Sequence, residues 1–496
     1  MKLVDLFPQA APQLKEFDVL QLTFDSRQVS QGSLFFALDG INYDGHDFVE
    51  QLLEKHKPTG QTPAFIVFVE NKSPKTKSFL NHPAVVAVDD TFRALGEIAS
   101  RFYGNPSKHL LICGVTGTNG KTTSTYLLES LLESWSMRPA VIGTVENRFG
   151  KLKVPALYTT PDAISLQALF HSFLKKGATA VVMEVSSHGL VQQRIAGTRF
   201  EAALFTNLTQ DHLDFHGTME NYFAAKTKLF LDYPLKVRAI HQDDPYGQRL
   251  VSMCLQRGFE VVTFGRSGCN VNYQNLKMSS SGIEGDLRIH WKGQNHALRI
   301  RSPLLGSFNA QNIAGAAAVA IGLNMPLPKI SEGLSKSRQV PGRLESVPNN
   351  RGVTVVVDYA HTPDALENAL KTLRRIAQKR LVCVFGCGGD RDATKRPLMG
   401  AIAEANADEI YITSDNPRTE NAAKIIDAIV QGLKRPEKAH RVEDRKSAIA
   451  QAIQSLAQGD LLLIAGKGHE DYQIIGTMKL PFDDRVVALE HLQDGN

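Results

Sequence analysis

A glycine-rich loop between a buried strand and a helix is the feature that most constrains this chain. The apolar run 109–114 leads into Gly114-Val-Thr-Gly-Thr-Asn-Gly-Lys-Thr-Thr123, and the helix-forming run 124–132 follows. Such a loop turns successive backbone N–H groups toward one anion, and the positive end of the helix adds to the attraction. The order predicts a nucleoside triphosphate site in which Lys121 reaches the terminal phosphates and the Thr122 hydroxyl ligates Mg²⁺. The strict G-x4-G-K-[ST] spacing is broken at Val115, so the alternative is a glycine-rich turn with a surface lysine.

Length and composition describe an ordinary globular protein with several domains. The chain has 496 residues, 43% of them hydrophobic and 22% charged, and about 150 residues per domain predicts roughly three domains. No apolar run is long enough for a membrane span, and the first residues lack the apolar core of a signal peptide. The net charge of +5 gives little support for nucleic-acid binding. We therefore expect a cytoplasmic enzyme, a monomer with no membrane or nucleic-acid partner.

Strand and helix patterns alternate along the whole chain, which predicts the α/β class. We expect a small N-terminal α/β domain over residues 1–105 and a central domain of the P-loop ATPase type over 106–340. The central sheet should be mostly parallel, with an antiparallel addition after Phe264. A hinge at 340–345 should lead into a C-terminal Rossmann-like domain over 341–496.

Polar side chains follow two of the predicted central strands. Glu184 ends an apolar strand, where it could serve as a metal-binding carboxylate, and the segment 206–216 places two histidines and two aspartates after another strand. Ligands of open α/β sheets lie beyond the carboxyl ends of the strands, so both groups are site candidates. His-Asp-His also hints at zinc, but no thiol or metal-ligand spacing supports it. From its helix alone, Lys226 is predicted to be a surface lysine.

These motifs, taken in order, resemble the Mur ligase family, whose members add amino acids to the peptide stem of peptidoglycan precursors. The resemblance rests on seven segments that cover the central and C-terminal domains: 117–123, 184–188, 207–216, 224–226, 306–312, 341–343 and 358–361. Asp25-Ser-Arg27 and Thr159-Thr-Pro161 are similar to segments of the member that acts third.

The resemblance implies roles for particular residues. Catalytic roles fall to Lys121, Glu184, His212 and Lys226, and the metal ligands for Mg²⁺ would be Thr122, Glu184, His212 and a carbamylated Lys226. ATP would be bound by Gly117, Thr118, Asn119, Gly120, Lys121, Thr122, Thr123, Asn309, Asn312, Arg343 and Asp358. The UDP-N-acetylmuramoyl-dipeptide would be bound by Ser26, Arg27, Thr159, Thr160, Ser186 and Arg194. The incoming amino acid would be bound by Arg391, Asp415, Asn416, Arg418, Gly466 and Glu470.

The amino acid added is expected to be meso-diaminopimelate. Asp415-Asn-Pro-Arg418 resembles the signature of the diaminopimelate-adding members, and an arginine fork can bind the second carboxylate of diaminopimelate bidentately. Asp415 and Asn416 would then offer acceptors for the distal ammonium group. The alternatives are the L-lysine-adding equivalent and a ligase similar to folylpolyglutamate synthase. More distant ones are a P-loop NTPase acting as a switch or motor and, from the glycines at 386–389, a dinucleotide-binding oxidoreductase.

Overall fold

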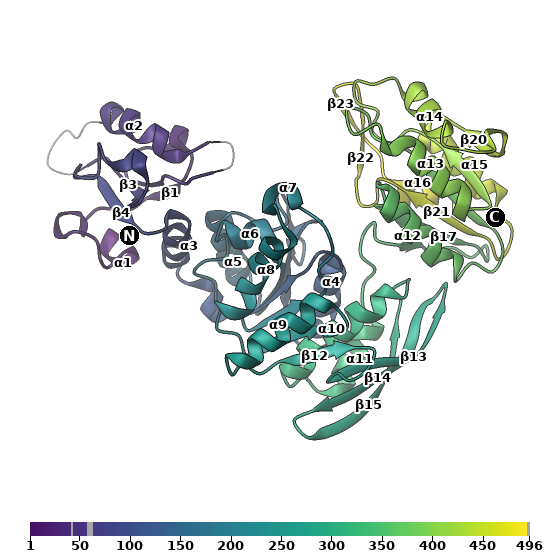
Figure 1. Cartoon of the computed structure of the whole chain (residues 1–496), viewed down its shortest axis with the longest axis horizontal. Helices are drawn as coiled ribbons and strands as arrows, with labels where there is room; N and C mark the ends of the chain where they lie inside the picture. Colours follow the sequence, from purple (N-terminus) through teal and green to yellow (C-terminus); the bar gives the residue numbers. More distant parts are fainter. Residues whose placement is uncertain (41–42, 57–62, 494–496) are drawn as a thin grey trace. The chain divides into compact units, whose positions relative to one another are not determined.

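The computed structural model describes residues 1–40, 43–56 and 63–493 (Figure 1). The described chain forms two compact units, the first holding residues 1–264 and 318–325 and the second holding residues 265–317 and 326–496. The predicted domain bounds at 105/106 and 340/341 stay predictions. Of the described helices, none is long and apolar enough to cross a bilayer.

The N-terminal part of the first unit is built on a parallel sheet with strand order β1-β2-β3-β4. The strands are β1 (Gln21–Thr23), β2 (Ser33–Phe36), β3 (Phe65–Glu70) and β4 (Val85–Val88), and the helices are α1 (Leu3–Leu6), α2 (Val49–Lys55) and α3 (Thr91–Phe102). β2 and β3 are almost entirely buried, because apolar clusters cover both faces of the sheet. That burial explains why both strands read as continuous apolar runs.

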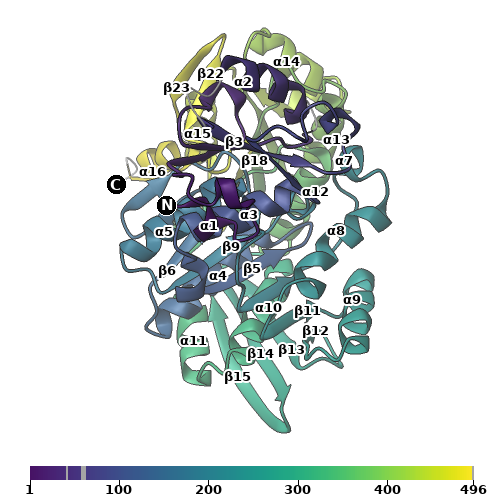
Figure 2. The same ribbon diagram turned by 90° about the vertical axis from the view of Figure 1, so that its left-hand side faces the viewer.

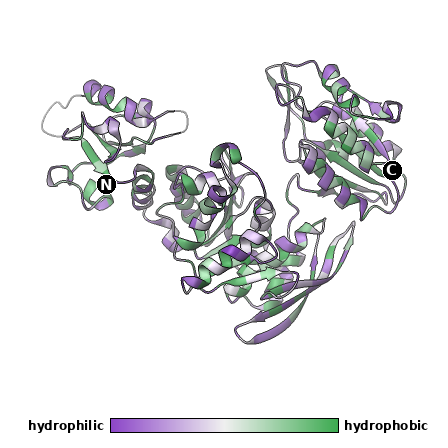
Figure 3. Cartoon of the chain, viewed as in Figure 1, coloured by the Kyte–Doolittle hydropathy of each residue, from purple (hydrophilic) through white to green (hydrophobic). Residues whose placement is uncertain are grey.

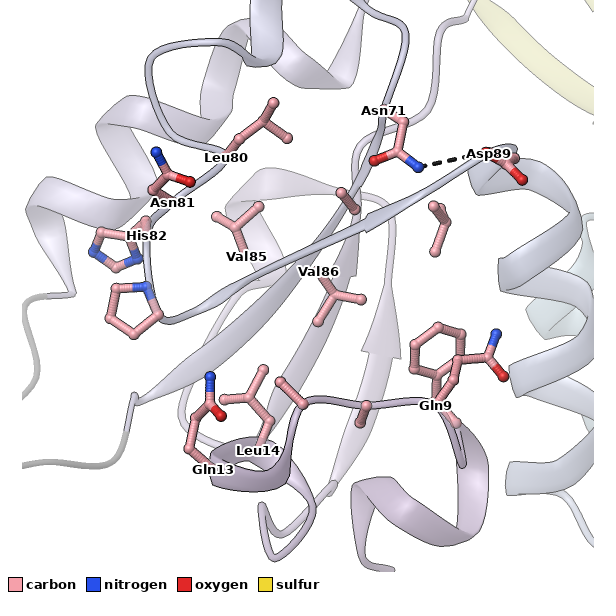
Figure 4. A pocket seen from close by; sticks show the side chains of 16 residues that line it. Gln9, Gln13, Leu14, Asn71, Leu80, Asn81, His82, Val85, Val86 and Asp89 are labelled. Carbon is pink, nitrogen blue, oxygen red and sulfur yellow. Dashed lines mark hydrogen bonds between the residues drawn. The ribbon is translucent and has the colours of Figure 1, made fainter.

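An open groove of about 490 Å³ runs beside β4, the edge strand of this sheet (Figure 4). Leu14, Val85 and Val86 are among its apolar members. Its polar border is made by Gln9, Gln13, Asn71, Asn81, His82 and Asp89. An edge strand leaves one row of backbone groups without a neighbouring strand, so the groove is a consequence of the sheet ending here. None of the predicted site residues lines it.

The larger sheet of the first unit has β5 in its middle, in the order β12-β11-β10-β5-β9-β6-β7-β8. Its strands are β5 (Leu111–Thr116), β6 (Pro139–Ile142), β7 (Asn147–Phe149), β8 (Leu152–Val154), β9 (Ala180–Glu184), β10 (Ala202–Phe205), β11 (Val237–His241) and β12 (Val262–Gly265). The helices that follow them are α4 (Lys121–Ser134), α5 (Ala163–Lys175), α6 (Ser187–Val191), α7 (Leu213–His216), α8 (Met219–Leu231) and α9 (Pro245–Gln256). Of helix α10 (Phe308–Gly322), residues 318–322 belong to this unit and residues 308–317 to the second. From β11 to β6 the strands are parallel, so the carboxyl ends of β5, β9 and β10 meet at one edge. That edge carries the phosphate loop and the two polar segments that the sequence singled out.

The second unit begins with an antiparallel ribbon, as the alternating pattern after Phe264 predicted. Its strands are β13 (Val271–Ser279), β14 (Gly282–Trp291) and β15 (Gln294–Ser302), which run side by side in both views (Figure 1, Figure 2). Helix α11 (Leu327–Ser335) packs against β15.

The rest of the second unit is a sheet in the order β16-β17-β21-β18-β19-β20, parallel except for β16. The strands are β16 (Glu345–Val347), β17 (Thr354–Asp358), β18 (Leu381–Phe385), β19 (Glu409–Ile412), β20 (Ala439–Arg441) and β21 (Leu461–Ala465), with a hairpin of β22 (Tyr472–Ile475) and β23 (Met478–Pro481). The helices are α12 (Pro363–Arg374), α13 (Lys395–Asn406), α14 (Ala422–Val430), α15 (Arg445–Ser455) and α16 (Asp484–Gln493). Apolar clusters lie on both faces of the sheet, and its inner strands are hydrophobic along their length (Figure 3). The predicted fold class, three α/β sheets with an antiparallel addition to the central part, is confirmed.

Candidate active site

The phosphate loop has the conformation that the sequence predicted. β5 ends at Thr116, Gly120 caps α4 with a φ of 82°, and α4 begins at Lys121. Gly117 also has a positive φ, and a Cβ there would collide with the Thr206 hydroxyl. Only glycine fits such a close approach. The ammonium group of Lys121 donates to the carbonyls of Gly117 at 3.0 Å and of Thr118 at 2.8 Å, which keeps it over the loop.

The segment that follows β10 braces this loop. The backbone N–H of Thr118 donates to the Asn207 carbonyl, and that of Asn119 donates to Oδ1 of Asn207, both at 2.9 Å. The Thr206 hydroxyl donates to the Asn119 carbonyl at 2.6 Å. Thr206 and Asn207, which the sequence offered only as parts of a polar cluster, therefore fix the shape of the phosphate loop.

Glu184 ends β9 with its side chain buried and held by three donors. Its Oε1 accepts from the Thr122 hydroxyl at 3.0 Å and from the backbone N–H of Thr144 at 2.9 Å. Its Oε2 accepts from the Thr144 hydroxyl at 3.2 Å. Because that hydroxyl has one proton, its 3.0 Å contact with the Thr159 hydroxyl must be one in which Thr159 donates. Thr144, which no sequence motif singled out, links the carboxylate to the predicted dipeptide-binding segment.

Thr122 and Glu184 together suit a hard cation. The Thr122 proton is directed at Glu184, so the lone pairs of that hydroxyl remain available, and Mg²⁺ prefers such oxygen donors. No set of three histidine, cysteine, aspartate or glutamate side chains in the described part of the chain could hold a metal on its own. The oxygen pair thus fits a metal whose remaining ligands come from phosphate and water.

Lys226 contradicts the prediction of a surface lysine. Its side chain is 1% exposed, and its ammonium group donates to the Gly117 carbonyl at 2.9 Å and lies 4.6 Å from the centre of the Tyr222 ring. Burial, followed by the nearby charge of Lys121, lowers the pKa of Lys226 well below its ordinary value. A sequence signal was available, because Tyr222, Lys226 and Phe230 recur every four residues and so share the buried face of α8.

His212 belongs to a cluster of aromatic and imidazole rings beside Lys226. It caps α7 with a φ of 52°, and its ring meets His188 edge-on at 5.1 Å between centroids. His188 stacks on Phe215 at 4.1 Å, and His216 lies 4.9 Å from Tyr222. Burial lowers the pKa of His216 to about 4, so this ring is neutral near pH 7. The cluster places His212 at the same sheet edge as the phosphate loop.

A cavity of about 630 Å³ in the first unit gathers several of the predicted substrate residues. Ser26, Arg27 and Arg194 line it, with Asp25, Asp162, Tyr158 and apolar side chains that include Phe24, Phe48 and Phe92. Asp25 accepts two bonds from the Arg27 guanidinium, at 2.9 and 2.8 Å, which orients that fork. Arg194 donates to the Thr160 carbonyl at 2.8 Å and lies over the Tyr158 ring.

Thr160 and Ser186 lie next to Glu184. The Thr160 hydroxyl donates to the Glu184 carbonyl at 3.0 Å and accepts from the Ser186 N–H at 2.9 Å. The Ser186 hydroxyl accepts from the Gly189 N–H at 3.1 Å, as the N-cap of α6. These bonds connect the predicted dipeptide segment to the backbone of Glu184 within one unit.

The remaining predicted ATP residues belong to the second unit. Each carboxylate oxygen of Asp358 accepts one backbone N–H, Oδ2 from Leu344 at 2.7 Å and Oδ1 from Ala360 at 2.9 Å. Asp358 therefore fixes the segment around Arg343, whose guanidinium lies 5.4 Å from the centre of the Tyr359 ring. Asn312 donates to Oδ1 of Asn309 at 2.8 Å, and Asn309 donates to the Leu305 carbonyl at 2.7 Å. Contacts of these residues with a nucleotide stay predictions.

The loops after β19 and β21 bring the predicted amino-acid residues together. Asn416 accepts from Lys467 Nζ at 3.1 Å and from the Ile474 N–H at 3.0 Å, and it donates to Glu470 at 3.0 Å. The Asn416 oxygen is thus already used twice inside the protein, so Asn416 organises the pocket. Lys467, which lies within the segment 466–470 that the family resemblance assigned to this pocket, is fully buried and also lies 3.7 Å from Asp415.

Arg418 and Arg391 occupy neighbouring loops of the same unit. Arg418 has a φ of 51°, its N–H donates to the Ile474 carbonyl at 3.1 Å, and Nη1 donates to the Gly389 carbonyl at 2.7 Å. The Gly389 carbonyl therefore holds one edge of the Arg418 guanidinium, and the bond to Ile474 in β22 fixes the Arg418 backbone. Arg391 is exposed, at the end of the glycine-rich loop that follows β18.

Burial raises the pKa of Asp415, and the charges of Arg445 and Lys467 oppose that rise.

Three family models match the chain one after another. The model "Mur ligase family, catalytic domain" matches residues 19–103, "Mur ligase middle domain" matches 115–320, and "Mur ligase, glutamate ligase domain" matches 342–468. The chain belongs to the Mur ligase family. As a Mur ligase it is an ATP-dependent ligase of peptidoglycan precursor synthesis, and this membership sets aside the NTPase switch and the oxidoreductase.

Similar proteins narrow the comparison within the family. The UDP-N-acetylmuramoyl-L-alanyl-D-glutamate–2,6-diaminopimelate ligase of Geobacter metallireducens is 43% identical, over 98% of this chain and 97% of its own. The ligase of the same name from Thermosynechococcus vestitus is 45% identical, over 96% and 94%. A solved structure of such a ligase is 34% identical, covers 100% of this chain and 99% of its own, and has a TM-score of 0.76. A folylpolyglutamate synthase from Mycobacterium tuberculosis (17% identical, TM-score 0.60, 82% of this chain and 95% of its own) shares only the fold.

Proposed function

We propose that this Mur ligase joins the amino group of meso-diaminopimelate to the D-glutamate of UDP-N-acetylmuramoyl-L-alanyl-D-glutamate. The observation that carries the proposal is the pocket at 415–418 and 466–470, where a buried lysine and two carboxylates surround Asn416 and an arginine lies at the border. The names of the relatives agree with this substrate pair.

The chemistry follows from making an amide out of a free carboxylate. An oxygen of the D-glutamate carboxylate attacks the γ-phosphorus of ATP and ADP leaves, which gives an acyl phosphate. The amine then attacks the acyl carbon, phosphate leaves with the electron pair of the C–O bond, and the amine loses a proton. Lys121 over the phosphate loop would offset the charge that develops between these two anions. Mg²⁺ held by Thr122 and Glu184 would add charge neutralisation at the phosphates.

Lys226 would act as a carbamate in this enzyme. Only a neutral amine adds CO₂, and burial next to Lys121 favours the neutral form of Lys226. As a carbamate it would become an anion beside the Lys121 cation, so the two side chains would attract each other. Together with His212 and Glu184 it would complete the metal-binding groups at this sheet edge.

The cavity lined by Ser26, Arg27 and Arg194 would receive the UDP-sugar. Exposed aromatic rings at Phe24, Tyr43 and Tyr158 border it and offer faces on which a pyrimidine can stack. The arginines supply charge for the anionic diphosphate or carboxylate. Thr159, Thr160 and Ser186 would place the dipeptide end near Glu184, because hydrogen bonds already link Thr159 and Thr160 to that residue or to Thr144.

Arg418 would select diaminopimelate over L-lysine. Diaminopimelate has a second carboxylate on its far carbon, which an arginine fork can bind with two hydrogen bonds. With L-lysine bound, an ammonium group would instead face the guanidinium without a partner. The L-lysine-adding reaction is the second candidate, and comparing the two amino acids as substrates decides between the two reactions.

The deciding assay measures phosphate release with ATP, UDP-N-acetylmuramoyl-L-alanyl-D-glutamate and one amino acid at a time. We expect turnover with meso-diaminopimelate and a kcat/KM for L-lysine at least about a hundredfold lower, because an unpaired charge in such a pocket costs several kcal/mol. Equal efficiency or a preference for L-lysine would overturn the substrate assignment. Release that does not depend on an amino acid would contradict the ligase chemistry.

A further inference from the structure

Arg445 and Asp484 form an ion pair with no solvent exposure at either side chain. Arg445 is the first residue of α15 and Asp484 is the first residue of α16. Nε and Nη2 of Arg445 donate to the two carboxylate oxygens of Asp484, both at 2.7 Å. A buried pair of this kind adds little net stability, since burying the two charges offsets their attraction. The role of the pair therefore lies in the contacts that the Arg445 guanidinium makes with other groups.

The rest of the guanidinium reaches two strand-end loops. Nη1 donates to the Ser414 carbonyl at 3.2 Å, and Nη2 donates to the Ala465 carbonyl at 3.0 Å. These carbonyls immediately precede Asp415 and Gly466, at the carboxyl ends of β19 and β21. Those strands are not neighbours, because β18 lies between them, so no backbone ladder can hold the two loops to each other. Arg445 connects the two loops through side-chain hydrogen bonds across the end of β18.

On the pocket side the same two loops meet closely. Lys467 and Glu470 from one loop bond to Asn416 from the other, at 3.1 and 3.0 Å. Gly466 has a φ of 118°, and a Cβ there would lie 2.9 Å from Asp415 Oδ2. A shift of one loop against the other would break these contacts at once. Displacements of about 1 Å in such a site commonly cost two orders of magnitude in activity.

We propose that Arg445 is a positioning residue for the amino-acid pocket, which it shapes by fixing the Asp415–Arg418 loop against the Gly466–Glu470 loop. The inference rests on the proposed function, since that function makes these loops the amino-acid site. Arg445 itself is buried beneath the loops and reaches them through backbone carbonyls.

A second buried arginine in the chain provides a matched control. Arg148 donates to both oxygens of Glu129 and contacts Glu146 through Nε at 2.8 Å. The Arg148 side chain is nine-tenths buried. Like Arg445, it binds both oxygens of one carboxylate, but it lies in the other unit. Its guanidinium contacts the carboxylates of Glu129 and Glu146 and the Tyr126 ring, all of them in the first unit. Arg148→Lys therefore measures the effect of weakening a buried ion pair that does not hold the amino-acid loops.

The test compares steady-state kinetics of Arg445→Lys, Asp484→Asn and Arg148→Lys with the wild type. Lysine keeps the charge beside Asp484, but a single nitrogen cannot reach the carboxylate and both carbonyls. For Arg445→Lys we expect the KM for diaminopimelate to rise at least about tenfold, with the KM values for ATP and the UDP-sugar-dipeptide within about threefold. Asp484→Asn, which keeps the arginine but weakens its anchor, should show a smaller rise in the same KM. Arg148→Lys should lower the thermal midpoint without changing the ratio of KM values.

The outcomes separate positioning from general stability and from the choice of substrate. If Arg445→Lys raises all three KM values equally, or none of them, positioning is overturned. If that variant does not fold, Asp484→Asn decides on the same criterion, and an unchanged KM for the amino acid overturns the proposal. The wild type is first assayed against the amino-acid panel. If it selects another amino acid, the substrate assignment fails, and the KM for the amino acid it does use becomes the readout for Arg445.

Discussion

Replacing Thr144 by valine tests whether the hydroxyl network around Glu184 matters for turnover. Valine has nearly the shape of threonine, so the change removes one hydroxyl and little else. It deletes the bond from the Thr144 hydroxyl to Glu184 Oε2 and the contact with Thr159, and it leaves the backbone bond from Thr144 to Oε1. The carboxylate would keep two of its three donors.

The size of the effect follows from the bond that is lost. A hydrogen bond to a charged group contributes about 1.5–3 kcal/mol net. This one is 3.2 Å long and its donor residue is exposed to water, which places it at the low end, about 1.5 kcal/mol. If the whole amount is lost in the transition state, kcat/KM falls about tenfold. The link to Thr159 predicts that part of the loss appears as a higher KM for the UDP-sugar-dipeptide.

The assay is phosphate release with saturating diaminopimelate, titrating the UDP-sugar-dipeptide and, separately, Mg²⁺. Thr144→Ser is the matched control, because serine keeps the hydroxyl and loses only a methyl group, and it should stay within about twofold of the wild type. If valine retains the wild-type kcat/KM, or if serine is as impaired as valine, the hydroxyl network does not act in the way argued.

Three further predictions test other parts of the site. Lys226→Ala should lose at least about two orders of magnitude in rate, and formate or acetate should restore part of it by standing in for the carbamate; full activity without rescue would contradict the carbamate. Arg418→Ala should raise the KM for diaminopimelate by about tenfold or more with little change in the KM for ATP, and equal changes in both would argue for a structural role. His216, whose pKa falls from 6.5 to about 4, remains neutral in the folded protein while the unfolded chain gains a proton. Stability should therefore fall as the pH drops from 6.5 toward 4, by up to about 3 kcal/mol. Calorimetry of His216→Phe should show a flatter dependence, and an unchanged slope would refute the assignment.

The sequence predicted those parts of the molecule whose signal is local. β5, the glycine loop and α4 follow one another along the chain, and the apolar runs of β9 and β10 place Glu184 and the polar segment 206–216 at the same sheet edge. Each of these features depends on a strand period, a turn residue or a cap within a few positions. The fold class and the family were predicted for the same reason.

The parts that could not be predicted depend on contacts between distant positions. Thr144 and Glu184 are 40 residues apart, and Arg445 and Asp484 are 39 apart. Nothing in the local pattern around any of them shows which partner it has. For Lys226, the four-residue spacing with Tyr222 and Phe230 could have predicted a place on the buried face of α8. It was assigned to the surface because lysine side chains are rarely buried.

Both units use the same solution to one problem of parallel sheets. Such sheets bring the carboxyl ends of their strands to one edge, which is why sites form there, but the loops beyond the last ladder bond have no regular backbone partners. In the first unit, Asn207 and Thr206 from the loop after β10 bond to the phosphate loop after β5. In the second unit the loops to be joined follow strands that are not adjacent, so a longer side chain is required, and the five donors of a guanidinium can reach a carboxylate and two carbonyls at once. A lysine or a glutamine at 445 could not make that set of bonds. The identity of the residue, and not only its charge, should therefore decide the affinity for the amino acid.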